Sequence, residues 1–206
     1  MLSKRSSALL GIFLFVLAML LACSGPSEAE TQFNSGTEIN EDSEYRDAIT
    51  QANETIRLDP TDTEAYLARG AAYSVPGRHQ LAIQDFDEAI RLDSSQAEAY
   101  QMRGTSYSFL GQHRRSIQDF NKAIRLDPSQ AEAYYNRGVE NRELGQQQLA
   151  IQDFDEAIRL DPSDVDAYIN RGNSYNDLGE PKRAIRDYDE ATPPGPVRCR
   201  CLHQPR

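Results

Sequence analysis

Apolar residues recur at helical spacing along most of the chain, and this pattern itself returns every 34 positions. The twelve residues Ala82–Asp93 (AIQDFDEAIRLD) reappear unchanged at Ala150–Asp161, and a near copy, SIQDFNKAIRLD, lies between them at Ser116–Asp127. Within each copy the apolar residues are mostly three or four positions apart, so they share one face of a helix. A fixed period of this length predicts one supersecondary unit stacked on copies of itself.

The copies define a frame of equal units, each one repeat period long. A unit reads Tyr-x-x-Arg-Gly-x-x-Tyr, then Ala-x-x-x-Phe, then Ala-Ile-x-Leu-Asp-Pro, with single departures such as Asn141 for the second tyrosine. A degenerate unit comes first, because Phe33-Asn34-Ser35-Gly36 overlays Tyr135-Asn136-Arg137-Gly138 in this frame. The predicted units are 29–62 (degenerate), 63–96, 97–130, 131–164 and 165–191 (truncated).

This pattern resembles the tetratricopeptide repeat family, whose unit has the same length and is a pair of antiparallel helices. The resemblance covers Thr63 to Ala191 and rests on several fixed positions that repeat in phase. It implies an all-α fold, a right-handed solenoid of antiparallel helix pairs. The chain departs from the family at the arginine of the Tyr-x-x-Arg-Gly pattern, where the family usually has leucine.

Two glycines recur in every unit. The first falls inside the first helix, where glycine costs about 1 kcal/mol relative to alanine, and this predicts that the second helix packs against bare backbone. The second follows the first helix and suits a left-handed position after a helix end. The two sets are Gly70, Gly104, Gly138 and Gly172, and Gly77, Gly111, Gly145 and Gly179.

Charged residues recur in phase as well. An arginine of the first helix and an aspartate of the second keep the same spacing, which suggests an Arg–Asp ladder tying helices within or between units. An acid at the second position of each unit is interpreted as part of a capping box (Ser95-x-x-Glu98, Ser129-x-x-Glu132); the alternative is an acidic stripe for a basic ligand. The three sets are Arg69, Arg103, Arg137, Arg171; Asp85, Asp119, Asp153, Asp187; and Glu64, Glu98, Glu132, Asp166.

The N-terminal residues differ from the rest. Lys4 and Arg5 precede an uncharged stretch, Ala8 to Ala22, which is short for a membrane-spanning helix and typical of a secretory signal. It ends Leu20-Leu21-Ala22-Cys23, which resembles a bacterial lipobox. We therefore expect a lipoprotein signal peptide at 1–22, lipid modification at Cys23, a tether at 23–29, and an exported, membrane-anchored protein. An ordinary signal peptide or an uncleaved anchor helix is the alternative.

The C-terminal residues differ again. After Ala191 the unit pattern gives way to Thr-Pro-Pro-Gly-Pro and a basic segment, so 192–206 is an irregular tail or the product of a shifted reading frame. No polar capping helix follows the last unit, and the alternative function is therefore self-association through that uncapped unit.

Composition narrows the functional classes. The chain has 32 acidic and 22 basic residues without a basic cluster, so no nucleic-acid partner is expected. It lacks a phosphate loop, a nucleophile elbow and an HExxH motif, so we expect neither an enzyme nor a cofactor. His79 and His113 occupy one repeat position. Cys199-x-Cys201-x-His203 lacks a second spaced pair, so no metal site is predicted.

Binding residues are expected on the concave face, which the resemblance places at unit positions 5, 9, 12 and 13. These positions vary between units while the structural positions stay fixed, as on a ligand-reading surface; drift of solvent-facing residues is the alternative. Only Arg142 is basic there, so a clamp for C-terminal carboxylates is not expected. The predicted partner-binding residues are Leu67, Val75, Gln101, Phe109, Tyr135, Arg142, Ile169 and Asn173.

Together these features predict a lipid-anchored scaffold or adaptor of the bacterial cell envelope. It would hold a peptide or protein segment in its concave groove, with the membrane reached through the N-terminal lipid.

Overall fold

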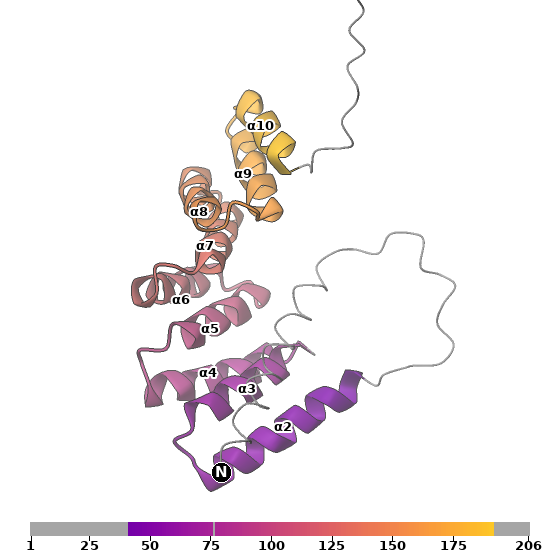
Figure 1. The fold of residues 1–206 in the computed structure, drawn as a ribbon, viewed down its shortest axis with the longest axis vertical. Coiled ribbons are helices and arrows are strands. Elements are labelled where there is room, and N and C mark those ends of the chain that lie inside the picture. Colours follow the sequence, from indigo (N-terminus) through magenta and orange to yellow (C-terminus); the bar gives the residue numbers. More distant parts are fainter. Residues whose placement is uncertain (1–40, 76, 192–206) are drawn as a thin grey trace, which may run out of the picture.

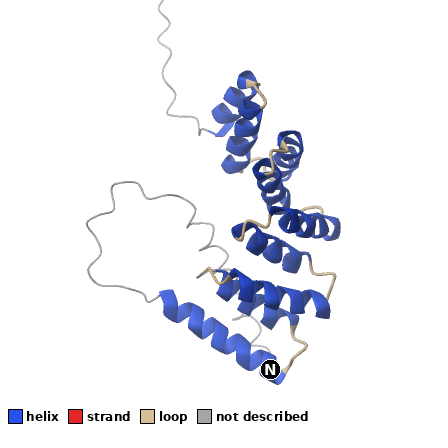
Figure 2. Cartoon of the chain, turned by 180° about the vertical axis from the view of Figure 1, so that it is seen from behind, coloured by secondary structure: helices blue, strands red, loops and turns tan. Residues whose placement is uncertain are grey.

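A computed structural model gives the fold of residues 41–75 and 77–191. All the regular structure in these ranges is helical, as predicted, and Figure 2 shows helices joined by short loops. The helices are α2 (Glu41–Leu58), α3 (Thr63–Ser74), α4 (His79–Leu92), α5 (Ala97–Phe109), α6 (His113–Leu126), α7 (Ala131–Glu143), α8 (Gln147–Leu160), α9 (Val165–Asp177) and α10 (Pro181–Ala191).

The helices form an elongated stack. They follow one another along the longest axis from α2 to α10 (Figure 1), and each packs against its neighbours in chain order. Four of them, α3, α5, α7 and α9, begin one repeat period apart and are the first helices of successive pairs. These first helices also contact one another across the seams between pairs. Because helices on the inner side of a curved stack come closest together, we take the first helices to line its inner face.

The core of each pair is a phenylalanine set against a glycine. Phe86, Phe120 and Phe154 are at most 1% exposed. A Cβ built on Gly70 would lie 2.6 Å from Cε1 of Phe86, closer than real carbon contacts allow. The prediction that the second helix packs against bare backbone is therefore confirmed. In the last pair Tyr188 takes the place of the phenylalanine.

The turn inside each pair depends on a left-handed glycine. Gly77, which follows α3, has a φ of 77°, and its three counterparts have φ between 67° and 76°. An L-residue with a side chain seldom adopts this conformation, so glycine is required where the sequence pattern predicted it.

The turn between pairs corrects the capping-box prediction. Ser95 lies before the helix start, and its backbone N–H and hydroxyl both donate to Oδ1 of Asp93, at 2.9 and 2.6 Å. The residue that caps α5 is Gln96, which makes no capping bond through its side chain, and Glu98 is the second residue of the helix. Serine therefore closes the turn rather than starting the helix. Among the first helices of the described pairs, α3 and α9 have a side-chain cap, from Asp62 and Asp164.

The predicted Arg–Asp ladder is present in all four described pairs. Arg69 on α3 donates from Nε and Nη2 to Asp85 on α4, at 2.9 and 2.6 Å, and its Nη1 reaches back to Asn53 on α2 at 2.7 Å. Hydrogen bonding to Asp85 raises the pKa of this guanidinium. Each arginine thus joins the helices of its own pair and the helix before it. The same contacts recur for Arg103, Arg137 and Arg171.

Helix α2 ends in the repeat frame, since Leu58 precedes Leu92 by one repeat period. It starts earlier in its unit than α4 does and packs on α3. The predicted signal peptide, Cys23, the tether and the tail at 192–206 lie outside the described residues. Among the helices in the described ranges, none combines the length and the hydropathy needed to cross a membrane.

Candidate protein-interaction surface

The inner face carries an exposed aromatic side chain near the end of α5. Phe109 is 70% exposed, and its ring stacks on the imidazole of His79 on α4, with centroids 4.6 Å apart and planes within 4°. Burial lowers the pKa of His79, so this imidazole is neutral near pH 7. The stack fixes the orientation of Phe109 and leaves the other side of its ring open to solvent. Ile169 on α9 is a second apolar side chain on this face and is 37% exposed.

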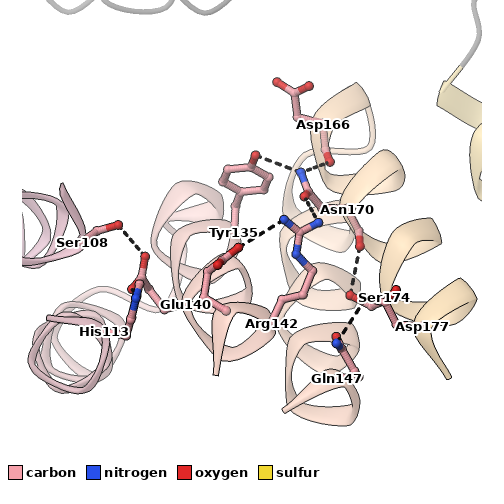
Figure 3. Close-up of polar contacts among 11 residues, drawn as sticks. Ser108, His113, Tyr135, Glu140, Arg142, Gln147, Asp166, Asn170, Ser174 and Asp177 are labelled. Atoms are coloured by element: carbon pink, nitrogen blue, oxygen red, sulfur yellow. Dashed lines mark hydrogen bonds and ion pairs between the residues drawn. The ribbon is translucent and has the colours of Figure 1, made fainter. Parts of the chain in front are cut away.

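A second group of inner-face residues is polar and interconnected (Figure 3). Arg142 on α7 donates from Nη1 to Oδ1 of Asn170 on α9 at 2.9 Å. Asn170 in turn donates from Nδ2 to the hydroxyl of Tyr135, at 3.1 Å, and to the backbone carbonyl of Asp166. Tyr135 and Arg142 are thereby held in place between two units. Asn170 was not among the predicted residues.

A third group is a buried carboxylate at the seam between the units 97–130 and 131–164. Glu140 on α7 is only 2% exposed and accepts from the Ser108 hydroxyl at 2.5 Å. Its other oxygen lies 2.8 Å from Nδ1 of His113, so both partners belong to the preceding pair (Figure 3). Sequence reasoning missed Glu140; the signal was a lone acid at a position held by Ala72, Ser106 and Ser174 elsewhere.

The remaining predicted residues divide into available and unavailable ones. The prediction that Leu67 contacts a ligand is wrong, because Leu67 is only 9% exposed and packs with Phe86 in the core. Asn173 accepts a hydrogen bond from the Tyr188 hydroxyl at 2.8 Å, so its oxygen is already engaged. Val75 and Gln101 are half-buried on the inner side of the stack.

The acids at the second position of each unit form a row along the first helices. All four are exposed, and within the described part of the chain their side chains make no hydrogen bond or ion pair. Desolvation and the neighbouring charge of Glu64 raise the pKa of Glu98. The capping-box interpretation does not hold for these acids, and the acidic-stripe alternative stays a prediction. We call this set the acidic row: Glu64, Glu98, Glu132 and Asp166.

The described ranges hold no group of three or more metal-binding side chains. Cys199, Cys201 and His203 lie outside those ranges.

These features define a class: an all-helical repeat protein with a preformed inner surface. Tetratricopeptide repeat models match residues 41–97, 104–139, 131–164 and 154–186. The chain is therefore a tetratricopeptide repeat protein, as its sequence pattern predicted.

Solved structures share this fold. The chain is 25% identical to a crystal structure of MamA, with a TM-score of 0.69 over 76% of this chain and 94% of that one. It is 20% identical to MamA 41-end from Desulfovibrio magneticus RS-1, with a TM-score of 0.68 over 74% and 86%. It is 24% identical to YrrB, described as a TPR protein with an unusual peptide-binding site, with a TM-score of 0.63 over 74% and 79%. The comparison with curated proteins gives no significant match.

Proposed function

We propose that this protein is an interaction scaffold that binds a peptide or protein segment on its inner face. The observation that carries the proposal is Phe109, a large aromatic residue left 70% exposed yet held in a fixed orientation by the stack on His79. An exposed, preorganised aromatic group loses little side-chain entropy on binding and is a typical anchor for a partner. YrrB, by its description, has a peptide-binding site on this fold.

The charges of the inner face define the chemistry of the bound segment. The acidic row presents four carboxylates without a cation beside them in the described part of the chain, while Arg142 is already bonded to Asn170. A segment with lysine or arginine residues along the acidic row and an apolar side chain against Phe109 complements this surface. A free C-terminal carboxylate does not.

A selection from a random peptide library on the immobilised protein tests this function. We expect enriched peptides that combine basic residues with an aromatic or aliphatic one. Phe109→Ala should weaken binding of such a peptide about 10- to 100-fold, because it removes the anchor. Leu149→Ala is the matched control, since Leu149 is also an exposed apolar residue (48%) but lies on α8, a second helix. It should leave the affinity unchanged.

Two results would contradict the proposal. One is the enrichment of acidic peptides, which the acidic row should repel. The other is an equal loss of affinity in the Phe109→Ala and Leu149→Ala variants, which would place the contact away from the inner face.

We also propose, from the sequence of residues 1–23, that the scaffold is exported and anchored by a lipid on Cys23 at the cell envelope. An anchor would confine the scaffold to a membrane surface and raise its effective concentration toward partners there. Expression in bacteria fed a radiolabelled fatty acid tests the anchor. The label should enter the wild-type protein and be absent from Cys23→Ser, which should also leave the membrane fraction. Equal labelling of both proteins would refute the lipid site.

A further inference from the structure

The three seams between the described helix pairs, and the seam between α2 and α3, are closed by the same contact. The arginine of each first helix donates from Nη1 to an Asp or Asn on the second helix of the preceding pair, at 2.6–2.7 Å. Successive acceptors are one repeat period apart. They are Asn53 on α2, Asp87 on α4, Asn121 on α6 and Asp155 on α8.

Apolar contacts accompany the arginine at these seams. At the seam between α4 and α5, Ala99 of the incoming helix is fully buried and belongs to the core cluster of Phe86 and Ala89. Tyr100 is 8% exposed, and Arg103 lies 5.6 Å from the centre of its ring. The incoming helix therefore presents the pattern Ala-Tyr-x-x-Arg to the pair before it.

The end of the described array offers this acceptor again without a donor. Asp189 on α10 follows Asp155 by one repeat period, is exposed, and makes no ion pair with any side chain that the structure describes. Ile185 on α10 is 58% exposed, whereas Ile151 at the same unit position is half-buried. We call Ile185, Tyr188 and Asp189 the end face.

We propose that the end face docks an amphipathic helix of another polypeptide that carries the pattern Ala-Tyr-x-x-Arg. The arginine would donate to Asp189, as Arg171 donates to Asp155 at 2.7 Å, and the small and aromatic residues would cover Ile185 and Tyr188. The partner helix would thus occupy the place that the first helix of a following pair takes at the other seams. The proposal is independent of the inner-face function, because α10 is a second helix.

The test uses a labelled peptide with the sequence of residues 97–109, held helical by a lactam bridge between two solvent-facing positions. Fluorescence anisotropy with the full chain should show saturable binding. Asp189→Arg should weaken this binding at least tenfold, and a peptide with aspartate in place of its arginine should restore it. Asp189→Asn is the matched control and should retain binding, because Asn53 and Asn121 accept the arginine at two seams.

Ile185 and Asp189 are exposed, so substitutions at these positions should leave the core packing intact. Circular dichroism of each variant checks that it is folded. Absence of saturable binding to the wild type would overturn the proposal. So would binding that Asp189→Arg and Ile185→Asp leave unchanged. Sedimentation of the chain alone tests whether the occupant is a second copy. Self-association that Ile185→Asp abolishes would overturn the partner helix in favour of a second copy of this chain.

Discussion

At the scale of single residues, the arginine in each first helix stands where the family usually has leucine and makes polar contacts to two other helices. Its Nε and Nη2 meet one carboxylate, and its Nη1 meets a second acceptor on another helix, so one side chain positions three helices. A planar guanidinium with several fixed donors can do this, whereas a lysine ammonium cannot hold the same geometry. Asp119, the partner of Arg103, is only 5% exposed, which makes the pair sensitive to the loss of either member.

We predict that Arg103→Met lowers the free energy of unfolding by about 3 kcal/mol, because it leaves the Asp119 carboxylate buried without its cation. Arg91→Met should cost less than about 1 kcal/mol, since the Arg91 side chain is 65% exposed in its pair with Glu88. Urea unfolding followed by circular dichroism gives both values. Similar losses in the two variants would mean that the buried pair adds no more than a surface one.

The phase of the arginines and aspartates was enough to predict the ladder from sequence, because residues that repeat in register occupy equivalent places in every unit. The residue on the preceding helix that accepts from Nη1 of each arginine could not be predicted in the same way. The acceptor is aspartate at Asp87 and Asp155 but asparagine at Asn53 and Asn121, so this position does not keep one residue type along the repeats. Which of several exposed polar residues faces the next helix depends on how the units are rotated, and that rotation follows from packing.

At the scale of elements, the turns between pairs are closed by a hydrogen-bonded aspartate. Asp127 accepts from the Ser129 hydroxyl and backbone N–H at 2.6 and 3.0 Å, and these bonds lower its pKa below 3.8. A carboxylate with a depressed pKa stabilises the fold above the unfolded value, and this stabilisation disappears as the pH falls through the folded value.

We therefore expect Ser129→Ala to raise the pKa of Asp127 toward 3.8 and to lower stability at pH 7 but not at a pH below the folded pKa. Carboxyl carbon NMR shifts follow the titration, and unfolding at the two pH values follows the stability. An Asp127 pKa unaffected by the substitution would show that the serine hydroxyl does not hold the carboxylate.

The seam between the second pair (α5 and α6) and the third pair (α7 and α8) contains a buried carboxylate that the other described seams lack, that of Glu140. We predict that Glu140→Ala costs about 1–3 kcal/mol, because Ser108 and His113 lose their common acceptor. In a double-mutant cycle with His113→Ala, the two losses should be non-additive by at least about 0.5 kcal/mol. Additive losses would indicate that the 2.8 Å contact between Glu140 and His113 contributes nothing to this seam.

Boundaries of the elements were more accessible to sequence reasoning than their caps. Glycine positions marked the turns correctly because left-handed backbone leaves few alternatives. Ser95 misled the interpretation, since a serine three residues before a glutamate suits both a capping box and a turn closed by Asp93. The sequence also could not show that Leu67 is buried, because burial at that position depends on Phe86 and Ala82 from the second helix.

At the scale of the whole molecule, the net charge of −10 would add to the attraction that the proposed acidic row exerts on a basic partner. We expect the affinity for a basic peptide obtained from the selection to fall roughly tenfold between low and high salt, because added ions screen exposed charges. Isothermal calorimetry at the two salt concentrations measures this. The same peptide with glutamine in place of lysine should bind more weakly and show little salt dependence. A salt-independent affinity for the basic peptide would remove the acidic row from the contact.

The seams of the array are not equivalent, and this has a consequence for how it comes apart. Arg69 and Arg137 reach back to a neutral asparagine, whereas Arg103 and Arg171 reach back to a charged aspartate. Salt screens the charged contacts and leaves the neutral ones almost unchanged. We therefore expect the array to separate first before α5 and before α9 at high ionic strength. Two of the expected cooperative blocks, α2–α4 and α5–α8, are larger than the unit that the sequence period defines, and the third is the single pair α9–α10.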